Sequence, residues 1–365
     1  MKTTKLYLGP QHPGITGNMM IELDVEGNKI VKSKTHVGYL HRGFEKLMER
    51  RTYIQSFPIV CRICVPEPDV NENNYARAVE NLSGLEVPER AKWIRAMILE
   101  MARLQSHLLW MGGQSGSMGL YTMPQWTIGD RDYLLDRFEE LTGGRIYHMY
   151  VWPGGVRKDL PVGFKTRMLD LMDYLETRMK DYTKLMFNNA IFKKRAIGTG
   201  IITKEMAIKS GVVGPVLRGT GIKHDVRIDE PYEIYNKLDF EVPTFEGGDI
   251  YSRALVRKAE FAQSISIIRQ IMDKIPEGPI YNRIPNPFKW KIPKGYTYVK
   301  LESSRGEFGY FMASDGSEKL RRVNVRGPAY VHGISLLDTI LPGARLGDVS
   351  TILNSLGVCP PEMER

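Results

Sequence analysis

The chain has 365 residues, which is enough to bury a sizeable core and predicts one large domain with a smaller attached layer or two. Hydrophobic residues make up 42% and charged residues 25%, values typical of globular proteins, so the composition excludes an intrinsically disordered chain. Lys and Arg number 51 against 42 Asp and Glu, giving a net charge of +9. Because the basic residues are scattered and form no run, we interpret this excess as a solvated or subunit-facing surface and expect no nucleic-acid partner.

We expect the chain to be cytoplasmic and not to span a membrane. No stretch of about 18 apolar residues occurs, and the first ten residues lack the basic-then-apolar order of a signal peptide. Contact with a membrane is therefore expected only through partner subunits. The three cysteines, Cys61, Cys64 and Cys359, are too few and odd in number for a disulfide framework, which indicates a reducing compartment.

Residues 1–45 predict an N-terminal β layer. Three segments, residues 5–8, 19–26 and 29–38, are rich in strong β formers. The dipeptide Gly27-Asn28 between the last two is a turn signal. The sequence therefore predicts a small sheet that contains a hairpin.

Residues 46–275 predict a bundle of long helices. Apolar residues recur at three- and four-residue steps in four segments, residues 88–111, 131–141, 164–187 and 253–275. We expect Gly112-Gly113 to end the first helix and Gly143-Gly144 to end the second. The core of such a bundle can hold inward-projecting ligands rigidly. An inserted α/β segment is expected near residues 190–250.

Residues 276–365 predict a second β element, a helix and a tail. A proline-rich connection begins at Pro276, and residues 296–302 and 307–313 then have strand composition on either side of a turn. A helix is expected over residues 346–356. The predicted fold class is therefore α+β, with a central long-helix bundle and small β layers at the N-terminal and C-terminal ends.

Two short segments share one layout, Cys64-Val-Pro-Glu67 near the start of the chain and Cys359-Pro-Pro-Glu362 at its end. Each places a soft thiolate donor and a hard carboxylate donor three residues apart, so that both can converge on one centre. Taken alone, Cys-x-x-Glu arises readily by chance, and two buried inert cysteines are an equally good explanation. The interpretation therefore depends on the residues that surround the two motifs.

A series of further segments, in a fixed order, covers nearly the whole chain. These segments are Gly9-Pro-Gln-His-Pro13, His36-Val-Gly-Tyr-Leu-His-Arg-Gly-Phe-Glu-Lys46, Arg51-Thr-Tyr-Ile-Gln55, Val87-Pro-Glu-Arg-Ala91, Leu104-Gln-Ser-His-Leu108, Pro153-Gly-Gly-Val156, Gly214-Pro-Val-Leu-Arg-Gly-Thr-Gly221, Gly248-Asp-Ile-Tyr251 and Arg305-Gly-Glu307. Together they resemble the quinone-facing subunit of respiratory complex I, which shares a superfamily with the large subunit of nickel-iron hydrogenases. The resemblance implies the hydrogenase large-subunit fold.

In the hydrogenases of this superfamily, two Cys-x-x-Cys pairs hold the metal centre. Arg62-Ile63-Cys64 resembles the start of the first pair and Cys359 stands where the second pair opens, but Glu67 and Glu362 replace the second cysteine of each. Carboxylate is a harder and poorer bridge than thiolate for a soft low-valent metal, so no intact nickel-iron centre is expected. The resemblance implies instead a degenerate site in a cavity to which the C-terminal tail returns.

The complex I branch carries a second His in the first loop and a Tyr after an Arg-x-Asp segment, and these groups would hydrogen-bond a quinone head. Thr16 and Val65 stand at these places, which argues against a quinone site. The remaining pattern resembles the sulfane-sulfur-reducing membrane complexes, which keep the architecture and lose half of the metal-binding cysteines. The resemblance implies reduction of polysulfide-like substrates.

The four residues of the two motifs have expected roles in that reaction. Cys64 and Cys359 are candidates for thiol–persulfide exchange with substrate sulfur. Glu67 and Glu362 are candidates for proton transfer to the departing sulfide. The alternative is that the cysteines only fill the core and that the iron-sulfur cluster of a partner reduces the substrate unaided.

Arginines and histidines complete the set of candidate site residues. Arg62 and Arg305 are expected to place positive charge near a polysulfide anion, although structural salt bridges are an equally good explanation. His12, together with His41, is a candidate proton relay, whereas a lone histidine more often has a structural role. We interpret His107 in that structural way.

The resemblance also implies the assembly around the chain. It predicts a catalytic-position subunit on the cytoplasmic face of the cell membrane, which receives electrons from ferredoxin through the 4Fe-4S clusters of a small subunit homologous to the complex I cluster-bearing subunit. Further peripheral subunits and antiporter-like membrane subunits would couple the reaction to ion translocation, and no cofactor is expected on this chain. Two alternatives remain, a quinone-reducing or hydrogen-evolving subunit and a non-catalytic scaffold.

Overall fold

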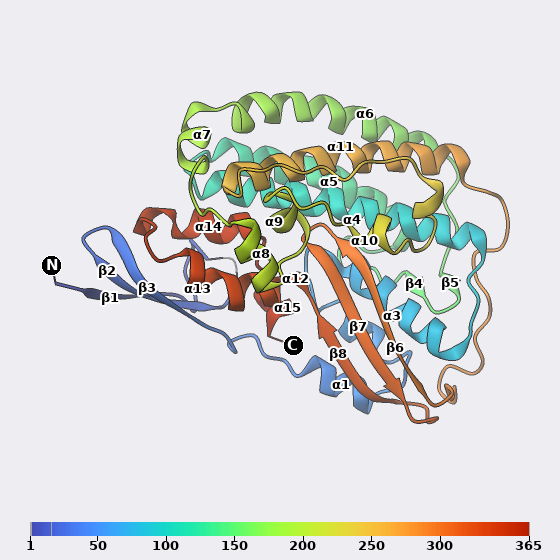
Figure 1. Cartoon of the computed structure of the whole chain (residues 1–365). Helices are drawn as coiled ribbons and strands as arrows, with labels where there is room; N and C mark the ends of the chain where they lie inside the picture. Colours follow the sequence, from blue (N-terminus) through green and yellow to red (C-terminus); the bar gives the residue numbers. More distant parts are fainter. Residues whose placement is uncertain (1, 16, 365) are drawn as a thin grey trace.

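The structure of the chain is a computed structural model that describes residues 2–15 and 17–364. It combines long helices in the middle of the chain with small antiparallel sheets near both ends, as the α+β prediction expected (Figure 1). The helices are α1 (Phe44–Arg50), α2 (Phe57–Val60), α3 (Pro68–Ser83), α4 (Glu89–Gly116), α5 (Thr122–Thr142), α6 (Phe164–Tyr182), α7 (Ala190–Ala196), α8 (Lys204–Ser210), α9 (Gly214–Arg218), α10 (Val226–Asp229), α11 (Ile250–Lys274), α12 (Pro328–Tyr330), α13 (Leu337–Ile340), α14 (Val349–Leu356) and α15 (Pro360–Met363). The strands are β1 (Thr4–Leu8), β2 (Met20–Glu26), β3 (Lys29–His36), β4 (Val151–Trp152), β5 (Gly155–Val156), β6 (Gly295–Ser303), β7 (Gly306–Ser314) and β8 (Leu320–Arg326).

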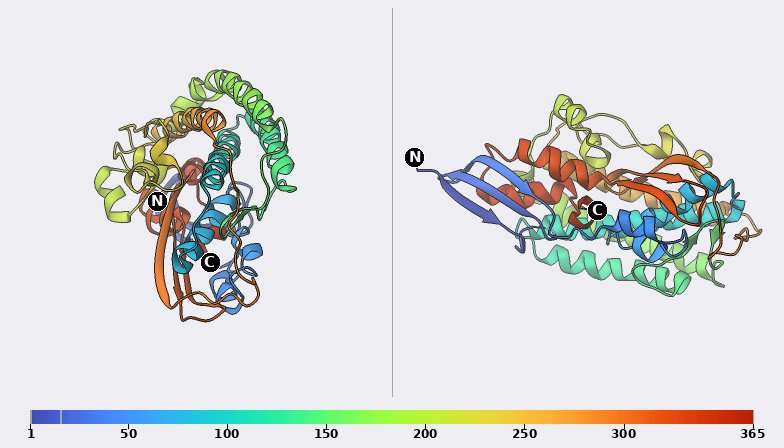
Figure 2. Two further views of the ribbon diagram at one scale, coloured as in Figure 1. Left: turned by 90° about the vertical axis from the view of Figure 1, so that its right-hand side faces the viewer. Right: turned by 90° about the horizontal axis from the view of Figure 1, so that it is seen from below.

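The first sheet, in the order β1-β2-β3, projects from one end of the molecule (Figures 1 and 2). Along β2 every second residue is buried, so that Ile21, Leu23 and Val25 share the inward face. The carboxylate of Asp338 in α13 accepts hydrogen bonds from the backbone N–H and the hydroxyl of Thr35, at 2.9 and 2.8 Å. The predicted N-terminal hairpin is confirmed, and it is fastened to the C-terminal part of the chain.

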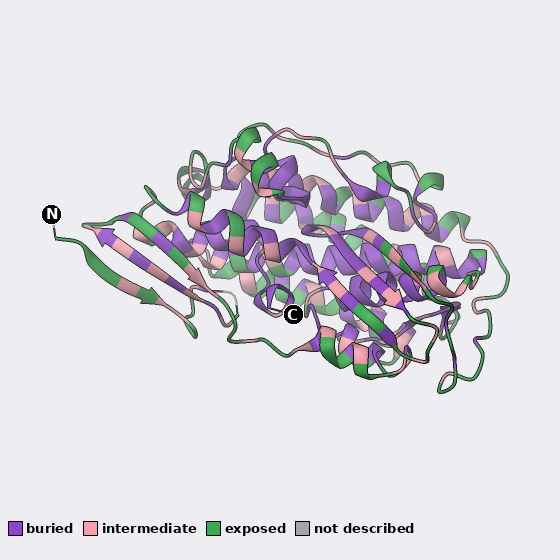
Figure 3. Cartoon of the chain, turned by 60° about the horizontal axis from the view of Figure 1, so that its bottom comes forward, coloured by how far each residue is buried: buried purple, intermediate pink, exposed green. Residues whose placement is uncertain are grey.

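Four long helices form a bundle in which α4 packs against α5 and α11, and α6 packs against α11 and α5 along the outer edge of the molecule (Figures 1 and 2). Helix α4 is buried over most of its length, and Figure 3 shows buried residues following the inner helices while exposed residues mark the outer strands and loops. The predicted central bundle is therefore present. None of the described helices combines the length and the apolarity needed to cross a membrane.

The expected stop of the first long helix at Gly112-Gly113 is wrong, because α4 continues to Gly116. A Cβ on Gly112 would lie 2.8 Å from Oγ1 of Thr127 and 3.3 Å from Cα of Pro124, both in α5. Gly112 therefore allows two helices to approach closely. The stop at Gly143 is confirmed, since this residue ends α5 in the left-handed conformation.

Other helix boundaries also differ from the prediction: α5 begins at Thr122 and not at residue 131, and residues 346–348 form a 3-10 turn before α14. Helix α11 begins at Ile250 because the carboxylate of Asp249 accepts the backbone N–H of Ser252 at 2.8 Å, which caps the first turn. The helix predicted over residues 164–187 changes at Tyr182 into a π-helical turn, Thr183–Phe187. Such turns depend on hydrogen bonds that apolar periodicity does not report.

The segment 190–250 contains the short helices α7 to α10 and a 3-10 turn, and no strand, so the α/β content expected there is wrong. In this segment, side chains that accept hydrogen bonds from backbone N–H groups stabilise the first turns of the helices. Asn189, Thr203 and Asp225 each accept a backbone N–H at the start of one of these helices.

Helix α3 was not singled out in the sequence, because many of its buried residues are polar. Asn71, Glu72, Asn73 and Asn74 are all fully buried. The carboxylate of Glu72 accepts the backbone N–H groups of residues 149–151, and the side chain of Asn71 accepts the hydroxyl of Tyr310. Polar residues at many buried positions interrupt the apolar period from which helices are predicted.

The second three-stranded sheet, in the order β6-β7-β8, covers the opposite end of the molecule from the N-terminal sheet (Figure 1). Its first two strands form a hairpin in register from Gly295 with Ser314 to Ser303 with Gly306, so that Ser304 and Arg305 make the turn. The chain then returns through α12 to α15 to the centre of the molecule. The C-terminal tail therefore ends beside the hairpin turn.

The two neighbouring glycines of α4 provide a test of this packing. We expect Gly112→Ala to lower the free energy of unfolding by about 1 kcal/mol or more, because the added methyl group overlaps Thr127 and the backbone at Pro124. The matched change Gly113→Ala meets only Oδ1 of Asn354 at 3.7 Å and should raise stability by up to about 1 kcal/mol through helix propensity. Unfolding midpoints of the purified chain measure both. Equal stabilities, or the reverse order, would show that α4 and α5 do not approach as described.

Candidate functional site

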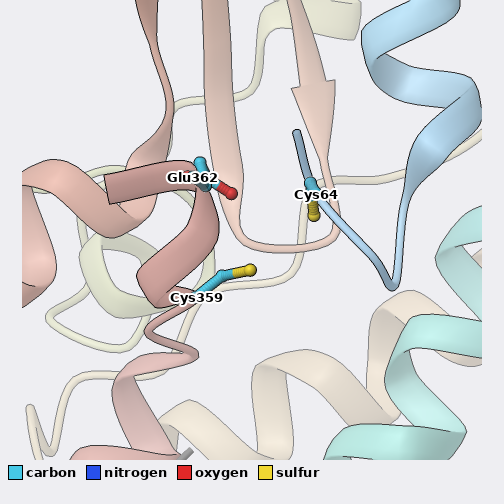
Figure 4. A group of neighbouring side chains, drawn as sticks. All are labelled: Cys64, Cys359 and Glu362. Atoms are coloured by element: carbon cyan, nitrogen blue, oxygen red, sulfur yellow. The ribbon is translucent and has the colours of Figure 1, made fainter. Parts of the chain in front are cut away.

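The structure brings the two Cys-x-x-Glu segments together, although their thiols are 295 positions apart (359 minus 64). The sulfurs of Cys64 and Cys359 and a carboxylate oxygen of Glu362 all lie within 4.8 Å of one another (Figure 4). Cys64 follows α2, whereas Cys359 precedes α15 and Glu362 lies within it. The expectation that the two motifs meet is confirmed.

Arg305 lies at the centre of this group. Its Nη2 is 2.6 Å from the sulfur of Cys64 and 2.9 Å from Oε2 of Glu362. Its Nε donates to Oε2 of Glu67 at 3.2 Å. Backbone N–H groups hold the other carboxylate oxygens, from Ser304 to Glu67 at 2.7 Å and from Ala329 to Glu362 at 2.8 Å. One guanidinium therefore joins both motifs.

The charges and hydrogen bonds of this group favour deprotonation of one of the two thiols. A hydrogen bond from Cys64 lowers the pKa of Cys359 to about 6, against the effect of burial and with help from Arg305. Burial and the same hydrogen bond raise the pKa of Cys64 well above its usual value. Because Arg305 contacts Cys64 directly while the hydrogen bond favours charge on Cys359, we treat the dithiol as one unit that shares a proton.

Glu362 is suited to exchange protons near neutral pH. Burial raises the pKa of its carboxyl group to about 7, although Arg305 opposes the shift. Cys359 adds to the increase, because a thiolate repels a second negative charge. The group therefore combines a thiolate, a thiol, a titratable carboxyl group and a fixed cation.

A cavity of about 920 Å³ opens beside these residues. Cys359, which is 7% exposed, lines it together with Arg305, whereas Cys64 is fully buried behind them. The lining is mainly apolar, and Tyr121 and Ile128 extend from it toward the surface with 73% and 50% exposure. A small molecule that enters the cavity therefore reaches Cys359 before Cys64.

Two predicted site residues lie outside the cluster. Arg62 is exposed, donates to the carbonyl of Pro58 at 2.8 Å and to the sulfur of Cys61 at 3.2 Å, and lies over the ring of Tyr147. The exposed His12 accepts the backbone N–H of Gly14 within the first loop, whose residues 13–15 line the cavity.

The other residues named from the family patterns are placed as follows. His41 contacts the backbone carbonyl of Glu364 at 2.7 Å. Val65 lines the cavity, and Thr16 lies outside the described residues. Val65, the residue compared above with a tyrosine of the complex I branch, therefore contributes an apolar side chain to the cavity wall.

Two buried groups in the cavity wall were not among the predicted site residues: Arg257 was not singled out, and His107 was given a structural role. His107 contacts Glu260 at 3.1 Å, and burial lowers its pKa although Glu260 opposes the shift. A signal was present in α11, where the polar residues 253, 257, 260 and 264 recur at the three- and four-residue steps expected of a buried face. Polar residues at that spacing mark a buried polar stripe.

The residues of the cluster do not fit a nickel-iron centre. Arg305 already lies between the sulfur of Cys64 and the carboxylates, so the cation that these donors hold is a guanidinium. A soft low-valent metal also prefers thiolates, of which this group offers two at most. The third cysteine, Cys61, has its sulfur near the carbonyl of Pro58 and the side chain of Arg62, and burial raises its pKa to about 12.

The shared proton of the dithiol can be measured by alkylation. In the reduced protein we expect iodoacetamide to modify Cys359 with a midpoint near pH 6, because Cys64 and Arg305 stabilise its thiolate. Arg305→Gln should raise the midpoint by about one pH unit or more, since it removes the cation and leaves two carboxylates beside the thiol. Peptide mass spectrometry assigns the modified residue.

Cys61 is the internal control for this titration, because its raised pKa predicts almost no reaction over the same pH range. A Cys359 midpoint near the ordinary thiol value, or one that Arg305→Gln leaves unchanged, would contradict the arrangement.

Comparison with known proteins places the chain in a family. It matches the family model of the respiratory-chain NADH dehydrogenase 49 kDa subunit over residues 117–291 and 286–365. It is 46% identical to a subunit of the NADH-quinone oxidoreductase of Thermosipho melanesiensis, with 100% of both chains covered. It is 40% identical to a subunit of the F420H2 dehydrogenase of Methanosarcina mazei, with 99% of this chain and 97% of that protein covered.

A solved structure agrees with these relatives. A chain in the structure of the membrane-bound sulfane sulfur reductase, an archaeal respiratory membrane complex, matches with a TM-score of 0.97 and 44% identity, and the match covers 100% of this chain and 98% of that chain. The superfamily inferred from the sequence motifs is thereby confirmed. The chain belongs to the family of the 49 kDa subunit of the respiratory-chain NADH dehydrogenase, in the superfamily of complex I and nickel-iron hydrogenase large subunits.

Proposed function

We propose that this chain occupies the catalytic position of a membrane-bound respiratory complex that reduces sulfane sulfur in polysulfide-like substrates. The observation that carries the proposal is the dithiol of Cys64 and Cys359, which lies against Arg305 and of which Cys359 lines the 920 Å³ cavity. Exchange with a sulfur chain requires an accessible thiolate and a second thiol close to it. The likeness to a chain of a sulfane sulfur reductase over its nearly full length supports the same function.

The proposal includes the partners of the chain. Electrons pass from ferredoxin through the 4Fe-4S clusters of a small subunit homologous to the complex I cluster-bearing subunit, and further peripheral subunits complete the assembly on the cytoplasmic face of the membrane. Antiporter-like membrane subunits couple the reduction to ion translocation. Relatives named as subunits of a quinone oxidoreductase and of an F420H2 dehydrogenase, and a structural relative from a respiratory membrane complex, support a multisubunit assembly.

The first step is exchange at Cys359. Its thiolate attacks an outer sulfur of a trisulfide RSSSR, a bond forms between Cys359 and the SR group, and the perthiolate RSS⁻ leaves. Glu362 donates a proton to the leaving group, which its raised pKa allows near neutral pH. Arg305 stabilises the negative charge that moves between the sulfurs.

The second step transfers the oxidation to the dithiol. The sulfur of Cys64 attacks the sulfur of Cys359, the thiolate RS⁻ leaves, and the proton of Cys64 passes to it through the neighbouring carboxylates. Two electrons from the partner cluster and one proton then convert the Cys64–Cys359 disulfide to one thiol and one thiolate. A second proton restores Glu362. The sum is RSSSR with two electrons and two protons giving RSSH and RSH.

Substitution of the cysteines tests the proposed function. In the purified complex supplied with reduced ferredoxin, Cys64→Ala and Cys359→Ala should each lower consumption of dimethyl trisulfide by about 100-fold or more, because each removes one partner of the exchange. The control Cys61→Ala changes a buried thiol outside the cluster and should stay within about twofold of the original protein.

Unchanged turnover in both cysteine variants would instead support a scaffold whose partner cluster reduces the substrate alone. Hydrogen evolution in place of sulfur reduction would also contradict the proposal.

Quinone reduction is the second candidate function. The mainly apolar lining of the cavity and the relatives named as subunits of NADH-quinone oxidoreductase favour it. The same complex, supplied with a short-chain quinone in place of the trisulfide, separates the two. Activity with the quinone alone, unaffected by Cys64→Ala and Cys359→Ala, would replace the first proposal with this one.

A further inference from the structure

Arg257 is a buried cation in the cavity wall without a negatively charged partner. It comes from α11, is 2% exposed and lines the 920 Å³ cavity. Its Nη1 donates to the carbonyl of Arg253 at 3.4 Å, and its Nη2 has no hydrogen-bond partner in the described part of the chain. The indole of Trp110 covers the guanidinium at 4.6 Å. Among the described residues, no carboxylate forms an ion pair with it.

The other large buried arginines are neutralised or fully bonded. Arg95, Arg103, Arg218 and Arg227 each form an ion pair with a buried glutamate. Arg253 donates to Ser355 and to the backbone carbonyls of Gly248 and Gly200. Buried charges are normally paired, so an unpaired guanidinium facing a cavity indicates a site for an anion.

Glu260, the nearest acidic candidate on the same helix, is already engaged. It accepts from Nη2 of Arg218 at 2.6 Å and contacts His107 at 3.1 Å. Burial lowers the pKa of Arg257 to about 9, with Glu260 opposing the shift, so the group remains a cation at neutral pH. Its charge is therefore available to a molecule in the cavity.

Arg257 is close to the reacting group. A Cβ on Gly357 would lie 3.2 Å from Nη2 of Arg257 and 3.1 Å from Cγ of Arg305. The two arginines therefore flank one glycine, two residues before Cys359. Gly357 has a φ of +67°, which a residue with a side chain rarely adopts, so the narrow space between the arginines stays open.

We propose that Arg257 binds the terminal thiolate of an anionic polysulfide and thereby orients its sulfur chain toward Cys359. This inference rests on the proposed function and names its substrate class, an inorganic polysulfide dianion in preference to a neutral organic polysulfide. One end of the dianion accepts charge-assisted hydrogen bonds from Nη2 of Arg257. The Cys359 thiolate then attacks an inner sulfur of the dianion, a bond forms between the two sulfurs, and the rest of the chain leaves as a persulfide anion that takes the proton of Glu362. Attack of the Cys64 sulfur on Cys359 expels the second fragment, which takes the Cys64 proton, so that tetrasulfide, two electrons from the partner cluster and two protons give two HSS⁻ ions.

A comparison of charged and neutral substrates tests the assignment. In the intact complex, Arg257→Gln should raise the KM for tetrasulfide dianion by about tenfold or more, because a bond between charged groups is lost. The kcat/KM for dimethyl trisulfide, which carries no charge, should stay within about twofold. Arg257→Lys keeps the positive charge but lacks the planar N–H donors of the guanidinium. The KM of this variant for tetrasulfide should therefore lie between those of the original protein and of Arg257→Gln.

The control Arg269→Gln removes a positive charge from the surface of the same helix, where it pairs with Asp173 and Glu176, and should change neither constant. If Arg257→Gln does not assemble, Arg257→Lys decides alone, and an unchanged KM for tetrasulfide overturns the inference.

Two other outcomes are decisive. Equal losses for the charged and the neutral substrate would mean that Arg257 has a structural role, which overturns the inference alone. An original complex that consumes neither compound overturns the proposed function and this inference with it.

Discussion

The guanidinium of Arg305 is the contact on which the arrangement of the site depends. It comes from the turn between β6 and β7, whereas Glu67 precedes α3 and Glu362 lies in α15, so one cation joins three segments that are distant in sequence. Removing one partner of a buried ion pair leaves the other charge unpaired, which typically costs about 3–5 kcal/mol. The same guanidinium contacts the sulfur of Cys64. The folding of the tail and the ionisation of the dithiol therefore depend on one side chain.

The backbone around the turn fixes the position of Arg305. A Cβ on Gly214 would lie 2.2 Å from the carbonyl oxygen of Arg305, and one on Gly306 would lie 2.6 Å from the backbone nitrogen of Gly214, so only glycines allow α9 to approach the turn. Arg103 of α4 donates to the carbonyls of Ser303 and Glu302 at 2.8 and 2.7 Å. Contacts from the helices therefore hold the hairpin turn in place, and the fixed turn keeps the guanidinium of Arg305 between Glu67 and Glu362.

Much of this arrangement is predictable from the sequence, because the periodicity of apolar residues identifies the long helices and the two Cys-x-x-Glu motifs identify the thiols. The predictions that were wrong concern features set by contacts between distant parts of the chain, which a local sequence pattern does not show. Gly112 lies inside α4 where α5 packs closely against it, and α3 buries many polar residues. Arg62 is only two residues before Cys64 in the sequence, yet its guanidinium lies over the ring of Tyr147 and outside the cluster. Arg257 was missed because a sequence does not show which buried arginine lacks a carboxylate partner.

Trapping the oxidised dithiol tests the proposed chemistry most directly. The complex is mixed with one equivalent of dimethyl trisulfide in the absence of an electron donor, free thiols are alkylated, and the digested peptides are mapped by mass spectrometry. We predict a disulfide that joins the peptides containing Cys64 and Cys359, whose sulfurs lie within 4.8 Å of each other, while Cys61 remains a free thiol. Recovery of Cys64 and Cys359 as separate alkylated or unmodified residues, with the trisulfide intact, would contradict the proposed exchange.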